Sequence, residues 1–154
     1  MKKRYLAVLA LTLVLALSAC GSAPVDVDMD ALRSDIQSAD LFDDELVAAR
    51  DSVITDVVGL DISKCDSAEY YMGSGATGEE YGLFVCKSEG AAKDLVKSLG
   101  ARRDDLYKTY ESYNTQALPR IENAVIEQSG VYVAFIIADN YDAAQSLADA
   151  AFSK

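Results

Sequence analysis

Residues 69–87, with the sequence EYYMGSGATGEEYGLFVCK, decide how this chain folds. Two stretches rich in aromatic and aliphatic residues, 69–72 and 80–87, are separated by the glycine-rich segment 73–78. Such stretches are typical of β-strands, and glycine readily adopts the positive φ angles that many turns require. The sequence therefore predicts a β-hairpin with its turn at 73–78.

The turn segment also satisfies the pattern GxGxxG, which in dinucleotide-binding proteins precedes a helix whose N-terminus faces the pyrophosphate. Here residues 79–87 have the composition of a strand. We therefore interpret the glycines as turn residues. Glu79 and Glu80 are neighbours in this strand and should point to opposite faces. That arrangement predicts a charged strand edge beside the turn and argues against a catalytic pair.

The same order of elements occurs again further along the chain. Ser88 can cap a long helix in which apolar residues recur at helical spacing. A second hairpin is predicted over 121–138, with its first strand starting at Ile121, and Asp139 or Asn140 can cap a last helix. The order ββα thus occurs twice. It predicts an α+β fold with a mostly antiparallel sheet in a ββαββα arrangement and helices on one face.

Two short helices are predicted ahead of the first hairpin. Asp28 or Asp30 can cap a helix that runs to about Ala39. A second helical stretch begins near Asp43 or Asp44 and ends at Gly59, because glycine commonly terminates helices. We expect both helices to pack on the main domain.

The first residues of the chain have the features of an export signal. A basic start, Met1–Arg4, precedes an apolar run over 5–17. That run is too short to span a bilayer, which needs about 20 residues. Residues 17–20, Leu-Ser-Ala-Cys, are similar to the bacterial lipobox. The resemblance implies that Cys20 receives a diacylglyceryl group, with acyl chains such as palmitate, and that a peptidase cuts in front of it.

These features divide the chain into a signal peptide at 1–19 that is removed, a lipidated tether at 20–27, and a single domain at 28–154. Two acyl chains suffice for stable anchoring, so we expect a lipoprotein on the extracytoplasmic face of the cell membrane. Its first partner is then the bilayer, through diacylglyceryl-Cys20. Without the signal, 11 basic residues face 25 acidic ones, a formal charge of −14. This charge excludes nucleic acid as an expected partner.

Several stretches together resemble one protein family. They are the turn segment 75–80, the end of the long helix at Tyr113-Asn114, and the second hairpin over 121–133. They are similar to uncharacterised Firmicutes lipoproteins that share a domain of unknown function, family four-three-five-eight. The resemblance implies a Gram-positive host and supplies no activity.

The chain contains no histidine. This excludes Ser-His-Asp and Cys-His catalysis and zinc sites built on imidazole, and neither an SxxK nor a GxSxG motif is present. The alternation Asp26-Asp28-Asp30 lacks the later Gly and Glu of a calcium loop. We therefore expect no metal and no cofactor.

The sequence favours a non-catalytic binding or accessory module that contacts an envelope protein or a cell-wall component. The alternative is a hydrolase of cell-wall polymers that uses two carboxylates, whose separation only the fold determines.

Cys65 and Cys86 are the cysteines that remain once Cys20 is acylated. Folding of the hairpin brings them approximately opposite each other, and an exported protein meets conditions that permit oxidation. We predict a disulfide between them. The alternative is a pair of buried free thiols.

Tyr107, Tyr110 and Tyr113 recur every third residue on the long helix. Aromatic patches can bind sugar rings or peptides, so these tyrosines and the turn at 73–80 form a candidate binding surface. The alternative is that they lie at the rim of the core with their hydroxyl groups in water.

Overall fold

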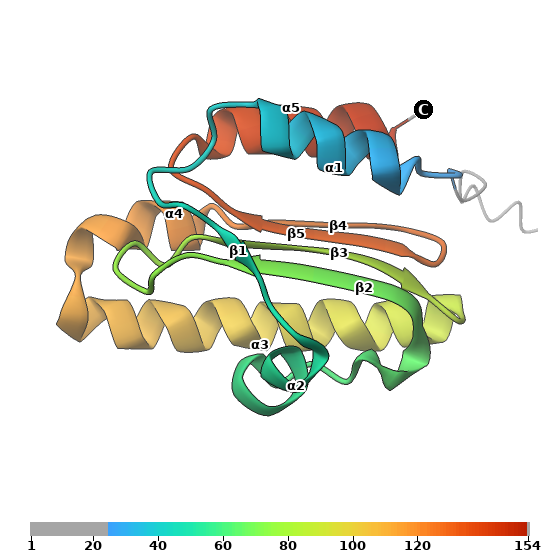
Figure 1. Cartoon of the computed structure of the whole chain (residues 1–154), viewed down its shortest axis with the longest axis horizontal. Coiled ribbons are helices and arrows are strands. Elements are labelled where there is room, and N and C mark those ends of the chain that lie inside the picture. Colours follow the sequence, from blue (N-terminus) through green and yellow to red (C-terminus); the bar gives the residue numbers. More distant parts are fainter. Residues whose placement is uncertain (1–24, 154) are drawn as a thin grey trace, which may run out of the picture.

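The computed structural model describes residues 25–153, which fold into three layers around one antiparallel sheet (Figure 1). The strands lie in the order β1-β2-β3-β5-β4. Their bounds are Val47–Ala48 (β1), Cys65–Met72 (β2), Glu80–Cys86 (β3), Val125–Ser129 (β4) and Tyr132–Ile137 (β5). The helices are α1 (Met29–Ser38), α2 (Asp51–Val53), α3 (Glu89–Tyr113), α4 (Leu118–Glu122) and α5 (Tyr141–Phe152), with a π-helical turn at Ile54–Val58 and 3₁₀ turns at Ile62–Lys64 and Thr115–Ala117.

The predicted α+β class and the repeated ββα order are confirmed. The first hairpin consists of β2 and β3, and the second of β4 and β5. The two hairpins join through their second strands, because β3 pairs with β5 from Glu80↔Ile137 to Val85↔Tyr132. Both of these strands are therefore central in the sheet, and nearly all of their residues are buried.

Helices cover both faces of the sheet, so the expectation that they lie on one face is wrong. Figure 1 shows α1 and α5 on one side and α3 with α2 on the other. A core on each face confirms this division: Ile36 and Ala144 belong to one core, and Leu99 and Phe84 belong to the other. The physical reason is the composition of β5, in which every residue from Val133 to Ile137 is buried. A strand that is apolar in successive positions needs cover on both faces.

The N-terminal part agrees with the prediction in its first helix and in the end of its second at Gly59. Helix α1 begins after Asp28, whose side chain accepts a hydrogen bond from the Ala31 amide at 2.9 Å. The second predicted helix is wrong in its first half, because Val47 pairs with Met72 as part of strand β1. Helical backbone starts only at α2 and ends at Gly59, which has a φ of 83°. Cross-strand pairing with β2 thus overrides the local helical pattern.

Two further local predictions have different outcomes. The glycine-rich segment is the predicted turn between β2 and β3, with Gly75 and Gly78 at φ angles of 88° and 76°. The strand predicted to start at Ile121 starts at Val125 instead, since Ile121 belongs to α4. Proline is favoured in the first turn of a helix, and Pro119 occupies that position in α4. Within residues 25–153, no helix has the length and hydropathy of a membrane span.

Candidate functional site

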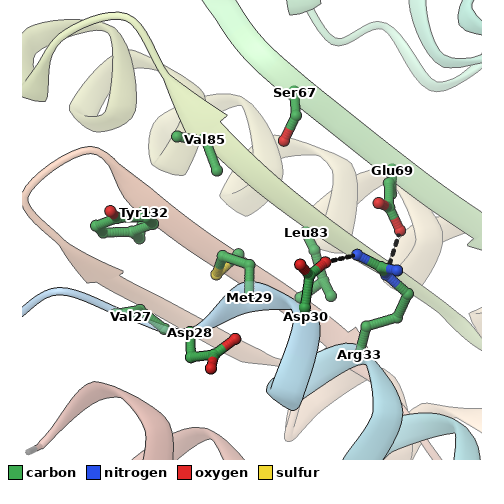
Figure 2. A pocket seen from close by; sticks show the side chains of 10 residues that line it. All are labelled: Val27, Asp28, Met29, Asp30, Arg33, Ser67, Glu69, Leu83, Val85 and Tyr132. Carbon is green, nitrogen blue, oxygen red and sulfur yellow. Dashed lines mark hydrogen bonds and ion pairs between the residues drawn. The ribbon is translucent and has the colours of Figure 1, made fainter.

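A cavity of about 460 Å³ lies between the start of α1 and the sheet (Figure 2). Its floor is apolar and includes Leu83 and Val85 of β3. Its wall is formed by α1 and the residues just before it, and β2 contributes Ser67 and Glu69 at the opposite side. The cavity exists because α1 covers the centre of the sheet and leaves the face of β2 partly open, so that Ser67 is exposed.

Charged groups concentrate on the wall of this cavity. Figure 2 shows Arg33 between two carboxylates, Asp30 on its own helix and Glu69 on β2. The Arg33 Nε atom lies 2.8 Å from Glu69 Oε2, as an ion pair whose N–H is not aligned for a hydrogen bond. Asp28 adds a third carboxylate to the lining. The cavity is therefore lined by three acidic residues and one basic residue above an apolar floor.

The start of the domain is fastened to the edge of the same cavity. The Ser129 hydroxyl oxygen accepts a hydrogen bond from the Val25 amide at 2.6 Å and donates one to the Val25 carbonyl at 3.1 Å. The Tyr132 hydroxyl donates to Asp26 Oδ1 at 2.5 Å, and this bond raises the pKa of the Tyr132 phenol. The chain that leads back toward Cys20 therefore leaves the domain beside the cavity.

A smaller hollow of about 180 Å³ lies further along α1. Tyr71 and Tyr81 line it and stack with their ring centroids 4.5 Å apart, and Phe42 stacks on Tyr81 at 5.8 Å. Tyr71 follows Glu69 by two residues on β2, so the two side chains share one face of the sheet. The α1 face of β2 is thus lined first by polar groups and then by aromatic rings.

Glu79 and Glu80 contradict the sequence-based interpretation of a charged strand edge, because each is only 2% exposed. Glu80 points toward α3, where Arg102 Nε and Nη2 donate to its two oxygens at 2.9 and 2.8 Å. The Tyr70 hydroxyl donates to Glu80 Oε1 at 2.6 Å. Burial and the neighbouring Glu80 charge raise the pKa of Tyr70 well above its ordinary value.

Glu79 points to the other face, as strand alternation requires. Its carboxylate accepts hydrogen bonds from the backbone amides of Asp43 and Asp139, both at 3.0 Å, and of Asp44 at 2.8 Å. Arg120 Nη1 lies 3.1 Å from Glu79 Oε1. Both glutamates are therefore occupied by several donors, on opposite faces of the sheet, and neither opens into the cavity.

The three tyrosines proposed as a binding surface differ in their surroundings. Tyr110 is buried and donates its hydroxyl hydrogen to the Gly75 carbonyl at 2.6 Å, which fastens the hairpin turn to α3. Tyr107 is half-buried, and Tyr113 is 68% exposed. The structure therefore does not bring the three together as one exposed patch. A binding role for Tyr113 stays a prediction.

Cys65 and Cys86 are cross-strand partners at the end of the first hairpin, and their Sγ atoms lie 3.6 Å apart. Both thiols are free. Burial raises the pKa of Cys65 and raises that of Cys86 to about 12. The predicted opposition of the two residues is confirmed, and the disulfide itself stays a prediction. Cys20, the predicted lipidation site, lies outside the described residues.

Sequence reasoning missed the residues of the cavity. Arg33 and Glu69 are far apart in the chain, and only the packing of α1 on the sheet brings them together. The one signal in the sequence is the acidic start of α1, Asp28 and Asp30, which by themselves indicate helix caps and an incomplete calcium loop. Within residues 25–153, no group of three His, Cys, Asp or Glu side chains has the geometry of a metal site.

Comparison with known proteins gives one match. Residues 39–138 match the model of a protein family described as a domain of unknown function, DUF4358. No curated protein and no solved structure matches the chain significantly. The matched range contains the whole sheet and α3, whereas α1 lies before it and α5 after it. Because this range covers more than half of the chain, the protein belongs to the family of the domain of unknown function DUF4358.

Proposed function

We propose that this protein is a lipid-anchored binding module of the cell envelope and that the cavity beside α1 is its binding site. The anchor is inferred from the lipobox-like residues 17–20, and the location is the extracytoplasmic face of the membrane. A partner in this setting is an envelope protein or a cell-wall component. The domain's function would then be to hold that partner near the bilayer.

The position of the cavity is the observation that carries this proposal. Val27 lines the cavity and lies seven residues after Cys20. The tether from Cys20 to the fastened residue Val25 spans at most about 18 Å, at about 3.5 Å per residue. A lipidated protein would therefore keep the cavity within about that distance of the headgroups, where a membrane-bound or wall-bound partner is reached.

The arrangement of carboxylates supports binding over hydrolysis. A glycosidase needs one carboxylic acid that donates a proton and a second carboxylate at a set distance. Asp30 and Glu69 are both ion-pair partners of the one Arg33 guanidinium, so neither is set apart as a proton donor. The buried Glu79 and Glu80 face away from each other and from the cavity. We therefore place a carboxylate-dependent hydrolase second.

Site-specific photocrosslinking in intact cells tests the proposed binding site. A photoreactive amino acid replaces Ser67, which lines the cavity and is exposed. The matched control replaces Lys97, an exposed residue of α3 on the opposite side of the sheet. The proposal expects the same envelope component to be captured from position 67 and not from 97. Equal capture from both positions, or none from 67, would contradict it.

Two further measurements separate the parts of this proposal. Cys20→Ser should abolish labelling of the protein with radioactive palmitate and leave residues 1–19 attached, because the acyl chains are carried by the Cys20 sulfur. Labelling and processing that are unchanged by Cys20→Ser would contradict the lipid anchor. Release of wall fragments by the purified protein, lost in Glu69→Gln, would favour the hydrolase.

A further inference from the structure

The outer edge of β2 is only half covered. Strand β1 pairs with Tyr71 and Met72, and the Ala49 amide donates to the Tyr70 carbonyl at 2.8 Å. Among residues 25–153, no strand pairs with β2 from Cys65 to Glu69 on this side. An open strand edge presents backbone groups that can pair with another chain.

The backbone N–H and C=O groups of Ala68 lie on the part of this edge that no strand of the described residues covers. In an antiparallel sheet, successive residues of a strand direct their N–H and C=O groups to alternate sides. The Tyr70 carbonyl points away from β3, toward Ala49. The backbone groups of Ala68, two residues earlier, therefore point to the same outer side, beyond the end of β1, and face no strand within the described part of the chain.

The cavity lies next to this open edge. Ser67 and Glu69 flank Ala68 in sequence, and both line the cavity on the α1 face. A strand added beside β2 would place its own side chains of that face about 5 Å from those of Ser67 and Glu69. The backbone of β2 would then form hydrogen bonds with the added strand, and the cavity would hold one or two of its side chains.

The acidic residues around this edge favour a partner segment with basic side chains. Asp66 is an exposed acid on the edge itself, and Glu69 and Asp30 lie at the cavity wall with one arginine between them. A basic side chain on the added strand would meet opposite charge, whereas a second copy of this chain would bring acid onto acid. The formal charge of the domain, with 25 acids, adds to that repulsion between copies.

We propose that β2 binds an extended basic polypeptide segment of an envelope protein, which adds as a strand beside Ala68 and places a Lys or Arg side chain in the cavity. This inference rests on the proposed binding function and names the class of its partner. It assigns a recognition role to Ala68, through its backbone, and to Asp66 and Glu69, through their charge.

Binding of a defined probe tests the inference. The detergent-extracted full chain, as processed by its host, is titrated with the fluorescent peptide Lys-Val-Lys-Val-Lys-Val. The expected affinity is at least about tenfold higher than for Glu-Val-Glu-Val-Glu-Val. Methylation of alternate peptide nitrogens on the pairing side should weaken binding by a similar factor, because it removes the donors of the strand pairing. Hydrogen exchange should show new protection of the Ala68 amide when the unmodified basic peptide is bound.

Two variants of the protein sharpen the test. Ala68→Pro removes the outward N–H, and proline is tolerated where a strand faces solvent; binding should fall at least about tenfold while the melting temperature confirms folding. Asp66→Lys should weaken binding of the basic peptide and improve binding of the acidic one. The matched control is Asp149→Lys, an equal change of charge at an exposed residue of α5, which contacts β4 at the other edge of the sheet, and it should have little effect.

The outcomes separate this inference from the proposed function. Peptide binding that survives nitrogen methylation and leaves Ala68 unprotected would overturn strand addition. Protection of Ala68 in the protein alone, rising with concentration, would show pairing of two copies and would also overturn it. If a partner is captured from position 67 but the basic peptide does not bind, the cavity remains the binding site and the proposal of a basic added strand is wrong.

Discussion

Arg102 on α3 binds both carboxylate oxygens of Glu80 on β3, at 2.9 and 2.8 Å, at the interface between the sheet and its longest helix. The Glu80 side chain is 3% exposed and that of Arg102 is 18% exposed. The pair lies within the core that α3 forms with the sheet, and the Tyr70 hydroxyl adds a third hydrogen bond. A charged pair at this depth needs both partners, because a buried charge without its partner is strongly destabilising.

Arg102→Met should lower the free energy of unfolding by about 3–5 kcal/mol, because it leaves the Glu80 carboxylate buried without its cation. Urea unfolding followed by circular dichroism measures the change. The double variant Arg102→Met with Glu80→Leu should recover much of the loss, since it removes both charges and keeps apolar volume. A double variant as unstable as the sum of the two single variants would contradict this view of the pair.

Glu79→Gln should loosen two segments at once. The Glu79 carboxylate accepts the amides of Asp43, Asp44 and Asp139, so it fastens the loop before β1 and the end of β5. A neutral amide keeps one acceptor oxygen and turns an NH₂ group toward these donors, and each hydrogen bond to a charged group contributes about 1.5–3 kcal/mol. We expect a loss of at least about 3 kcal/mol.

Amide hydrogen exchange localises the effect of Glu79→Gln. Exchange at Asp43, Asp44 and Asp139 should accelerate more than exchange in the centre of β5. The matched control is Glu122→Gln, which neutralises an exposed carboxylate at the end of α4 and should change little. Equal acceleration throughout the sheet would mean that Glu79 contributes only to global stability.

The hairpins and the three longest helices could be predicted because their signals are local. Ser88 caps α3 as expected, and Asn140, one of the two candidate residues, caps α5; their side chains accept hydrogen bonds from the Ala91 and Ala143 amides. Strand β1 could not be predicted, because Val47 becomes a strand residue only through its pairing with Met72. Its two residues carry no pattern of their own, and their exposure hides them from hydropathy arguments.

The candidate site could not be predicted from the sequence, because it too depends on contacts between distant parts of the chain. Glu69 precedes the buried Tyr70 on β2 as any half-exposed strand residue could, and Arg33 follows the usual pattern of an amphipathic helix. Their contact depends on which face α1 covers, and the sequence predicted helices on one face only. The apolar run that forms β5 contained the missing information, because a strand buried on both sides requires helices on both sides.

Cys65 and Cys86 should form a disulfide in the exported protein. Their residues are directly paired, and the Lys87 amide donates to the Lys64 carbonyl at 2.8 Å, which makes the cysteine pair a non-hydrogen-bonded one. Such pairs have the closer Cα separation, about 4.5 Å, within the range that disulfides accept. The sulfur atoms, now 3.6 Å apart, then need only a small side-chain rotation.

Thiol labelling of the denatured, unreduced mature protein measures this prediction. Oxidation should protect both cysteines from labelling and stabilise the fold by about 3 kcal/mol. The raised pKa values of both thiols leave little thiolate near neutral pH, so oxidation of the folded protein should be slow without an enzyme catalyst. Two labelled thiols in protein recovered from the cell envelope would show that the pair stays reduced.

The reduced protein should lose stability as the pH rises above about 9. Burial raises the pKa of Cys86 and of Tyr81 to about 12, from ordinary values of 9 and 10. A group whose pKa is higher in the folded state stabilises the fold fully below its unfolded pKa, and this contribution is lost as the pH rises through the folded value. The loss therefore falls between about pH 9 and pH 12, and at about 1.4 kcal/mol per pKa unit it amounts to about 4 kcal/mol for Cys86 and about 3 kcal/mol for Tyr81.

Urea unfolding at several pH values within this window tests the alkaline loss. Tyr81→Phe removes one of the groups and the hydrogen bond that its hydroxyl accepts from Gln37 at 3.2 Å. This variant should start slightly less stable and then lose less stability above pH 10, since phenylalanine does not ionise. The matched control is Tyr113→Phe, because Tyr113 is 68% exposed. The stability of this variant should change with pH as that of the unmodified protein does.

Oxidation of Cys65 and Cys86 should further reduce the loss of stability at high pH, because a disulfide has no thiol to titrate. An unfolding free energy that is constant from pH 9 to pH 12 in the reduced protein would show that these buried groups do not control its alkaline stability.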